Sequence, residues 1–259
     1  MLAIGALLRK ALTFSMLKQA WEKVFDNNGM AGVDGESIDM LVPQIDTVLR
    51  HNKQESPDFS ANQRLKQIEQ SLKTTASMES LRGSEGAAAA LYWRAFAGLV
   101  PPPWQFSKRL ARPAPDPVNA MLSLGYTLLY QTTAGLLQAR SLNAHLGMLH
   151  IPGGSHLALA SDLMEVFRAY VVDATVLKLL HTQQLDPQAH TLQSGTCSLS
   201  STTVKTFIRA LEDRFNGIQK HPQTDTEMDL RRIIDHDILT LIKAYRSNDA
   251  ACYQATRWR

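Results

Sequence analysis

Apolar residues recur at intervals of three and four along most of this 259-residue chain, while runs that alternate apolar and polar residues are scarce. The first pattern gives a helix one apolar stripe, whereas a half-buried strand needs the second. A hydrophobic fraction of 44% is enough to form a buried core, and no internal repeat or low-complexity tract interrupts the pattern. The sequence therefore predicts an all-α fold.

Capping and turn signals divide this pattern into separate helices. A helix that begins near Ser84 is expected to end at the prolines of residues 101–103, since proline cannot continue a helix. Asp116 followed by Pro117 is an N-cap with proline at the first helical position, and it predicts a long helix that ends at about Leu142. Further helices are expected over residues 155–181, 200–218 and 226–245.

A polar segment divides the chain into two unequal parts. Residues 51–62 (HNKQESPDFSAN) contain a proline and show no periodicity, so we interpret them as a linker. Residues 1–50 read as two helices around a glycine-rich turn, and residues 63–259 form the main helical domain. No β-domain is expected in either part.

Charge and cysteine content narrow the choice of function only slightly. The chain has 27 Lys and Arg against 24 Asp and Glu, a net charge of +3 that permits an anionic partner without requiring one. Cys197 and Cys252 form neither a disulfide framework nor a metal-binding spacing. The opening apolar run is short and precedes Arg9 and Lys10, the reverse of a signal peptide, so we expect a soluble cytoplasmic protein.

Acids and a histidine at the ends of apolar helices are candidates for metal-dependent chemistry. Glu85 lies in the first turn of a predicted helix, His150 in an apolar loop, and Asp162 and Glu165 share one face of a largely buried helix. Mg²⁺ and Mn²⁺ prefer carboxylate oxygens, tolerate one imidazole, and promote attack on phosphodiesters. Structural explanations stay open: Glu85 can stabilise a helix dipole, His150 can be a satisfied core histidine, and Arg168 can neutralise the acids.

Asp173 is a further acid on nearly the same helix face as Asp162. Eleven residues separate the two, which is about 16 Å along the helix axis. They cannot share a metal at that distance, so we expect Asp173 to make helix–helix contacts.

Four segments, in this order and near this spacing, resemble the CRISPR-associated spacer-acquisition integrase of the Cas-one family: SLRGSEGAAAALYW, DPVNAMLSLGYTLLY, LGMLHIPGGSHLALASDLMEVFRAYVVD and YQATRWR. The resemblance covers residues 61–259. It implies a helical catalytic domain in which Glu85, His150 and Glu165 hold Mg²⁺ or Mn²⁺, with Asp162 as a nearby acid and a further candidate metal ligand.

The resemblance also implies an activity and partners. A DNA endonuclease and integrase of this kind cuts and joins phosphodiesters, the 3′-hydroxyl of a short DNA fragment attacking the boundary of a repeat. The implied partners are DNA, the small ferredoxin-like Cas-two subunit and a second copy of the chain in a homodimer.

Basic side chains near these motifs are expected to bind DNA phosphates without reading the base sequence. A solvated basic loop is the alternative for each of them. Asn119 and Tyr126, on the helix of the DPVN motif, are expected to have packing or capping roles. The expected DNA-binding residues are Arg94, Lys108, Arg109, Arg112 and Arg168.

The chain departs from the family pattern before residue 61. The family normally begins with a β-rich domain, and nothing here reads as one. Instead, AWEKVFDNNGMAGVDGESIDMLVPQI resembles the opening of group II intron-type reverse transcriptases, without their YxDD motif, so reverse transcription is not expected. This departure leaves an alternative function, a catalytically inactive remnant that at most binds nucleic acid. His156 stands where the family has an arginine, and its role as a ligand stays open.

Overall fold

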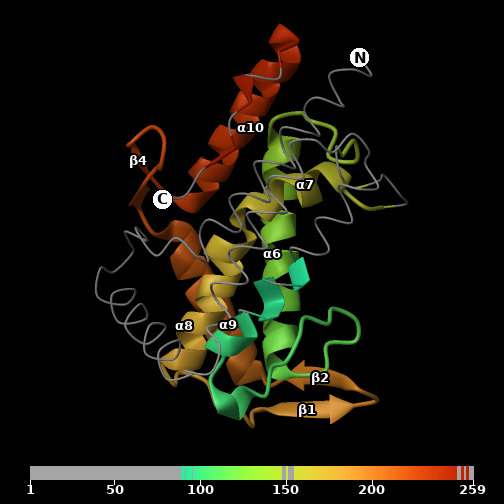
Figure 1. Cartoon of the computed structure of the whole chain (residues 1–259). Coiled ribbons are helices and arrows are strands. Elements are labelled where there is room, and N and C mark those ends of the chain that lie inside the picture. Colours follow the sequence, from blue (N-terminus) through green and yellow to red (C-terminus); the bar gives the residue numbers. More distant parts are fainter. Residues whose placement is uncertain are drawn as a thin grey trace.

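The computed structural model describes residues 89–90, 92–94, 96–147, 150, 155–249, 252–253 and 255–256. Glu85, the segment expected to resemble a reverse transcriptase (residues 1–50) and the expected linker (residues 51–62) lie outside these residues. The described helices pack along one another, and two small hairpins lie at the edges of the helical body (Figure 1).

Helix α6 (Pro117–Ala139) is the central element, in contact with α7, η2, α8, α9, α10 and β2. It begins where the sequence predicts, because the side chain of Asp116 accepts a hydrogen bond of 2.8 Å from the backbone N–H of Asn119 and Pro117 takes the first helical position. It ends at Ala139, slightly earlier than expected. The 3₁₀ turn η1 (Pro102–Trp104) lies where the prolines were expected to stop the preceding helix.

The second long helix has a wide turn at its centre. α7 (Ala158–Phe167), η2 (Arg168–Asp173) and α8 (Ala174–His181) follow one another directly, and η2 is a π-helix. Gly125 lets α6 approach this turn: a Cβ there would lie 2.5 Å from Cγ1 of Val172. π segments are rare in proteins and occur often at functional sites.

Two capped helices complete the helical part. α9 (Ser201–Asn216) begins after Ser200, whose hydroxyl accepts from the backbone N–H of Thr203. α10 (Leu230–Ser247) begins after Asp229, which caps the N–H of Arg232. α10 starts later than the expected residue 226 because residues 227–228 belong to a strand.

Two antiparallel hairpins correct the all-α prediction, so the fold is mostly helical with small sheets. β1 (His190–Gln193) pairs with β2 (Thr196–Leu199), His190 opposite Leu199, and β3 (Gln219–Lys220) pairs with β4 (Glu227–Met228). Ser194 and Gly195 have φ angles of 49° and 76°, which suit a two-residue hairpin turn. Strands of two to four residues are too short to produce a clear alternating pattern.

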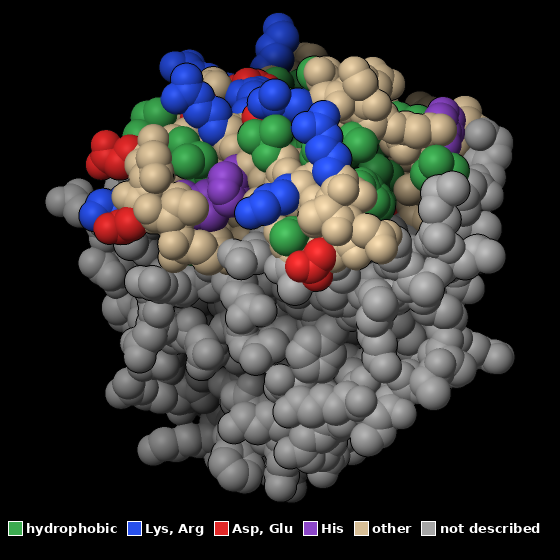
Figure 2. Space-filling model, turned by 90° about the horizontal axis from the view of Figure 1, so that it is seen from above, with side chains coloured by type: hydrophobic (Ala, Val, Ile, Leu, Met, Phe, Trp, Pro, Cys, Tyr) green, Lys and Arg blue, Asp and Glu red, His purple; other side chains and the backbone are tan. Residues whose placement is uncertain are grey.

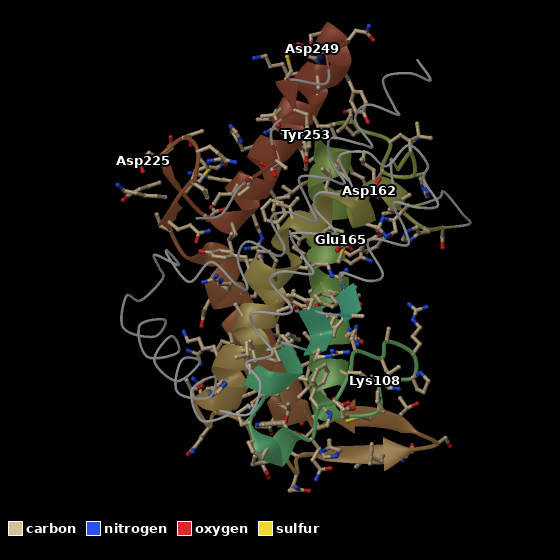
Figure 3. All side chains as sticks on the ribbon, viewed as in Figure 1. Lys108, Asp162, Glu165, Asp225, Asp249 and Tyr253 are labelled. Carbon is tan, nitrogen blue, oxygen red and sulfur yellow. The ribbon has the colours of Figure 1, made fainter. Side chains whose placement is uncertain are left out.

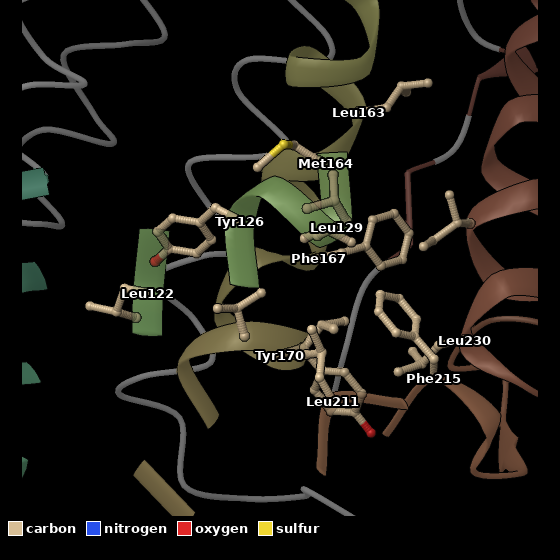
Figure 4. Close-up of a cluster of buried hydrophobic side chains, with 14 of the residues drawn as sticks. Leu122, Tyr126, Leu129, Leu163, Met164, Phe167, Tyr170, Leu211, Phe215 and Leu230 are labelled. Carbon is tan, nitrogen blue, oxygen red and sulfur yellow. The ribbon is translucent and has the colours of Figure 1, made fainter. Parts of the chain in front are cut away.

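The core lies between α6, the α7–η2–α8 helix, α9 and α10 (Figure 4). Phe167, Phe207 and Phe215 are fully buried there. In the part of the chain that the structure describes, no helix combines the length and the hydropathy that crossing a bilayer requires.

Candidate functional site

His150 and Asp162 meet although the first lies in a loop and the second on α7. Oδ1 of Asp162 accepts the backbone N–H of His150 at 2.9 Å and lies 2.7 Å from its Nδ1. The Asp162 carboxylate is buried, with 1% of its side chain exposed, whereas 36% of the His150 side chain is exposed. A single buried oxygen therefore fixes both the loop and the imidazole ring.

This contact determines which nitrogen of His150 can act as a ligand. An imidazole Nδ1–H that donates to a carboxylate leaves the lone pair on Nε2, the arrangement found in carboxylate–histidine–metal groups. His150 therefore has the donor chemistry for a divalent metal. Asp162 is placed to orient this ligand, a different role from the pairing with Glu165 considered from the sequence.

Glu165, also on α7, contacts Arg168 at the start of η2. Nη1 of Arg168 donates to both carboxylate oxygens of Glu165, at 2.6 and 2.7 Å, and the side chains of Arg168 and Glu165 are 30% and 24% exposed. Neutralisation by Arg168, the structural explanation offered for both acids from the sequence, therefore applies to Glu165. Asp162 pairs with His150 instead. Figure 3 shows Asp162 and Glu165 along the same helix.

A layer of aromatic and acidic residues lies behind Arg168. Its guanidinium carbon lies 4.1 Å from the ring centre of Tyr126. The Tyr126 hydroxyl donates to Asp173 at 2.5 Å, and the Tyr92 hydroxyl donates to the other carboxylate oxygen. Burial raises the pKa of Asp173 to about 6, although both tyrosine hydrogen bonds act in the opposite direction. Asp173 thus joins helices, as expected from its distance to Asp162.

Asn119 anchors the basic loop to the start of α6. The Nδ2 of Asn119 donates to the carbonyl of Lys108 at 2.9 Å and to the carboxylate of Asp116. Its Oδ1 accepts from the backbone N–H of Leu110 at 2.8 Å and from Nη1 of Arg109 at 2.9 Å. The cap of α6 is Asp116, whereas the side chain of Asn119, for which packing or capping was expected, fastens the preceding loop to the helix.

The basic residues expected to bind DNA differ in exposure. Arg94, Lys108 and Arg112 are exposed, whereas Arg109 is half-buried, with its guanidinium 5.4 Å from the Tyr126 ring centre. Lys108 lies well away from Asp162 and Glu165, beside the β1–β2 hairpin (Figure 3). Further Lys and Arg side chains gather on the face seen from above (Figure 2).

His156 packs beside His150 on the rim of the site. Its ring stacks on Tyr130, with centres 6.0 Å apart, and lies 6.1 Å from the His150 ring. Its Nε2 is 3.3 Å from the hydroxyl of Ser161. His156 therefore has neighbours that account for its position without a metal.

Among the described residues, one group of three side chains has potential ligand atoms all within 4.8 Å of one another: His221, His236 and Asp237. The backbone N–H groups of Gln223 and Thr224 donate to Nδ1 of His221, at 3.2 Å each, so the neutral ring carries its proton on Nε2. Burial lowers the pKa of His221 to about 4, and His236 adds to this shift. A protonated nitrogen does not bind a metal, so we interpret His221 as a structural residue of the β3–β4 loop.

Asp237 in the same group holds the C-terminal segment. Its two carboxylate oxygens accept the backbone N–H and the hydroxyl of Thr256, at 2.8 and 2.7 Å. Burial raises the pKa of this carboxyl to about 7. No sequence spacing pointed to this contact.

The sequence of this chain matches a known protein family. Residues 19–213 match the family described as CRISPR associated protein Cas1. The chain belongs to the Cas1 family. The match begins within residues 1–50 and spans the expected linker.

Curated Cas1 relatives are longer than this chain. The CRISPR-associated endonuclease Cas1 of Mycobacterium tuberculosis is 41% identical over 142 residues, which make up 54% of this chain and 42% of that protein. Among such relatives, the chain spans from about a third to about two thirds of their length, between 33% and 63%.

Solved Cas1-like structures share the fold. A chain of a Cas6-RT-Cas1–Cas2 complex superposes with a TM-score of 0.72 at 24% identity, covering 95% of this chain and 25% of the other. A casposase bound to integration product gives a TM-score of 0.69 at 21% identity, covering 100% of this chain and 66% of the other. At this level of identity, the comparison establishes the Cas1 fold.

Proposed function

We propose that this Cas1 chain is a metal-dependent DNA endonuclease and integrase of CRISPR adaptation, which cuts and joins phosphodiesters to insert new spacers into the repeat array. The observation that carries the proposal is the contact between His150 and Asp162, which prepares an imidazole nitrogen for a metal in a chain of the Cas1 family.

The donor set suits a hard divalent cation. His150 through Nε2 and Glu165 through its carboxylate would hold Mg²⁺ or Mn²⁺ together with Glu85, which is assigned from its sequence motif. When bound, such an ion polarises a phosphoryl oxygen and activates the attacking hydroxyl or water. Asp162 keeps the His150 ring oriented, and Asn119 holds the basic loop through which Lys108, Arg109 and Arg112 would bind phosphates.

The structural neighbours support the proposed partners. One was solved in a complex with Cas2, and another with an integration product. We therefore propose DNA and Cas2 as partners, and we propose a second copy of the chain from the resemblance in sequence alone. The segment at residues 1–50 is proposed as a remnant of a reverse transcriptase, and the neighbour that contains an RT part is compatible with this origin.

The test is a cleavage and strand-transfer assay on branched DNA that mimics a half-integrated spacer, a substrate that does not require Cas2. The full chain is assayed with Mn²⁺, Mg²⁺ or EDTA beside His150→Ala and Glu165→Ala. His190→Ala, in the β1–β2 hairpin, is the matched histidine control. We expect metal-dependent turnover that both site substitutions abolish and the control retains.

An absence of turnover would favour the alternative function, a catalytically inactive chain that at most binds nucleic acid. A folded chain that binds Mn²⁺ and DNA but shows no turnover would leave the site as a scaffold for nucleic-acid binding. Equal activity in all the variants would contradict the assignment of His150 and Glu165.

A further inference from the structure

Arg168 and a metal require the same oxygens of Glu165. One nitrogen of Arg168, Nη1, donates to both carboxylate oxygens at 2.6 and 2.7 Å, so a single cationic group contacts each oxygen of Glu165. A metal cation at Glu165 repels the guanidinium and competes for the same two oxygens, so it weakens this ion pair. Because Arg168 follows Glu165 by three residues on one continuous helix, it stays beside the site after the pair opens.

The surroundings of Arg168 hold its charge near the site. The guanidinium lies on the ring of Tyr126, which is fixed by the hydrogen bond of its hydroxyl to buried Asp173. A cation stacked on an aromatic face retains part of its stabilisation when its carboxylate partner is lost. Arg168 therefore has a position to occupy that does not require Glu165.

A second arginine shares this aromatic ring. Arg109 lies 5.4 Å from the Tyr126 ring centre, and its guanidinium donates to the neutral oxygens of Leu110, Asn119 and Ser123. These contacts leave the positive charge of Arg109 in place, whereas Glu165 neutralises that of Arg168. Opening the Glu165 pair adds a second cation near Tyr126, and two guanidinium groups suit a phosphate better than one.

We propose that Arg168 is a positioning residue that couples metal binding to DNA binding: it occupies Glu165 in the metal-free chain and transfers to a DNA phosphate when Glu165 binds the metal. This inference rests on the proposed function, because it takes Glu165 as a ligand. Its consequence is that metal and DNA each favour the binding of the other, by a reciprocal coupling.

The test measures metal affinity directly. Mn²⁺ binding to the full chain is followed by the electron paramagnetic resonance signal of free Mn²⁺, with and without a short DNA duplex and after subtraction of binding to DNA alone. Arg168→Gln should bind Mn²⁺ about two- to fivefold more tightly than the parent without DNA, since the competing ion pair is gone. With DNA present, the difference between the variant and the parent should disappear, because Arg168 of the parent has then left Glu165 for a phosphate.

This loss of the difference on adding DNA separates coupling from a purely structural role, which would change Mn²⁺ binding in the same way under both conditions. Arg168→Lys keeps a cation beside Glu165 and should restore most of the coupling. Arg109→Gln removes a nearby positive charge without touching Glu165. Equal tightening by Arg109→Gln and Arg168→Gln would trace the effect to general charge, and that result overturns the proposal.

Glu165→Gln separates the ligand role of Glu165 from the coupling through Arg168. Unchanged Mn²⁺ affinity in this variant would remove Glu165 from the ligand set, and the proposed site would then fail together with the coupling. Weakened affinity in Glu165→Gln, together with equal tightening in Arg168→Gln with and without DNA, would reject the coupling alone.

Discussion

The backbone N–H and the ring Nδ1 of His150 share one acceptor, Oδ1 of Asp162, at 2.9 and 2.7 Å. The loop and the ring are therefore oriented by the same buried atom. A carboxylate placed behind the ligand in this way controls the ligand atom without touching the metal.

Asp162→Ala is expected to lower Mn²⁺ affinity about 10- to 100-fold, because the ring loses its fixed tautomer and the loop its anchor. Asp162→Asn should have a smaller effect, since its amide oxygen can still accept both hydrogen bonds. Calorimetric titration with Mn²⁺ measures the two affinities. Equal losses in the two variants would mean that the carboxylate charge, and not the orientation of the ring, is what matters.

Gly147 is expected to tolerate no side chain. A Cβ there would lie 2.5 Å from Cβ of Ala158 and 2.7 Å from the carbonyl oxygen of His150. Gly147→Ala should displace the His150 loop and lower activity on branched DNA about tenfold or more, by analogy with other small displacements of a catalytic group. Activity at the level of the parent chain would show that the loop accommodates the methyl group.

Two glycines of α6 provide a matched pair for stability. Gly125→Ala should destabilise the chain by about 1–3 kcal/mol, because the new Cβ would lie 2.5 Å from Val172 and 2.9 Å from Phe207. At Gly135 a Cβ would meet none of the described residues within 4 Å, so Gly135→Ala should stabilise the helix by up to about 1 kcal/mol. Urea unfolding followed by circular dichroism compares them, and equal effects would contradict the close packing of α6 on η2.

Lys108 and Arg112 are expected to contribute to DNA affinity through phosphates alone. Alanine at either position should weaken binding uniformly across DNA sequences and reduce the slope of log affinity against log salt by about one. Fluorescence anisotropy over a series of salt concentrations measures the slope. Arg140→Ala, which opens the exposed ion pair with Asp235, is the control and should leave the slope unchanged.

His221 is expected to destabilise the fold in acid. Its pKa is about 4 in the folded chain against 6.5 as the ordinary value, so the unfolded chain binds the proton more readily. The contribution of the neutral ring is fully present above about pH 6.5 and is lost as the pH falls toward 4, a change of about 3 kcal/mol. Unfolding of the parent and of His221→Asn at a series of pH values isolates this slope, which should be absent from the variant.

Local signals in the sequence predicted the fold where a single segment decides the structure. Asp116 and Pro117 set the start of α6, and Ser200 set the start of α9. The β1–β2 hairpin also had a signal, the Ser194-Gly195 turn, which four-residue strands made easy to overlook. Contacts between distant segments had no such signal: Tyr92 and Asp173 are 81 residues apart, and nothing in their spacing joins them.

The candidate site, too, was predicted only in part from the sequence. The order of the motifs identified His150, Asp162 and Glu165 as candidates, but the sequence could not show which of these side chains contact one another. Packing decides that Asp162 binds His150 and that Glu165 binds Arg168. The tautomer of His150 depends on this choice, so its chemistry emerges only in three dimensions.

The π-helix η2 also limits how this chain can change in length. A π turn holds one residue more than an α turn, so deletion of one residue within Arg168–Asp173 would convert it to regular α-helix. Because such a deletion removes only the extra residue, α8 would keep its orientation relative to α7, and Val176, Leu179 and Leu180 would stay in the core. A deletion within the regular turns of α7 or α8 has no extra residue to remove, and it would turn every residue after it by about 100°. This helix can therefore lose one residue within Arg168–Asp173, whereas its α-helical parts can only accumulate substitutions.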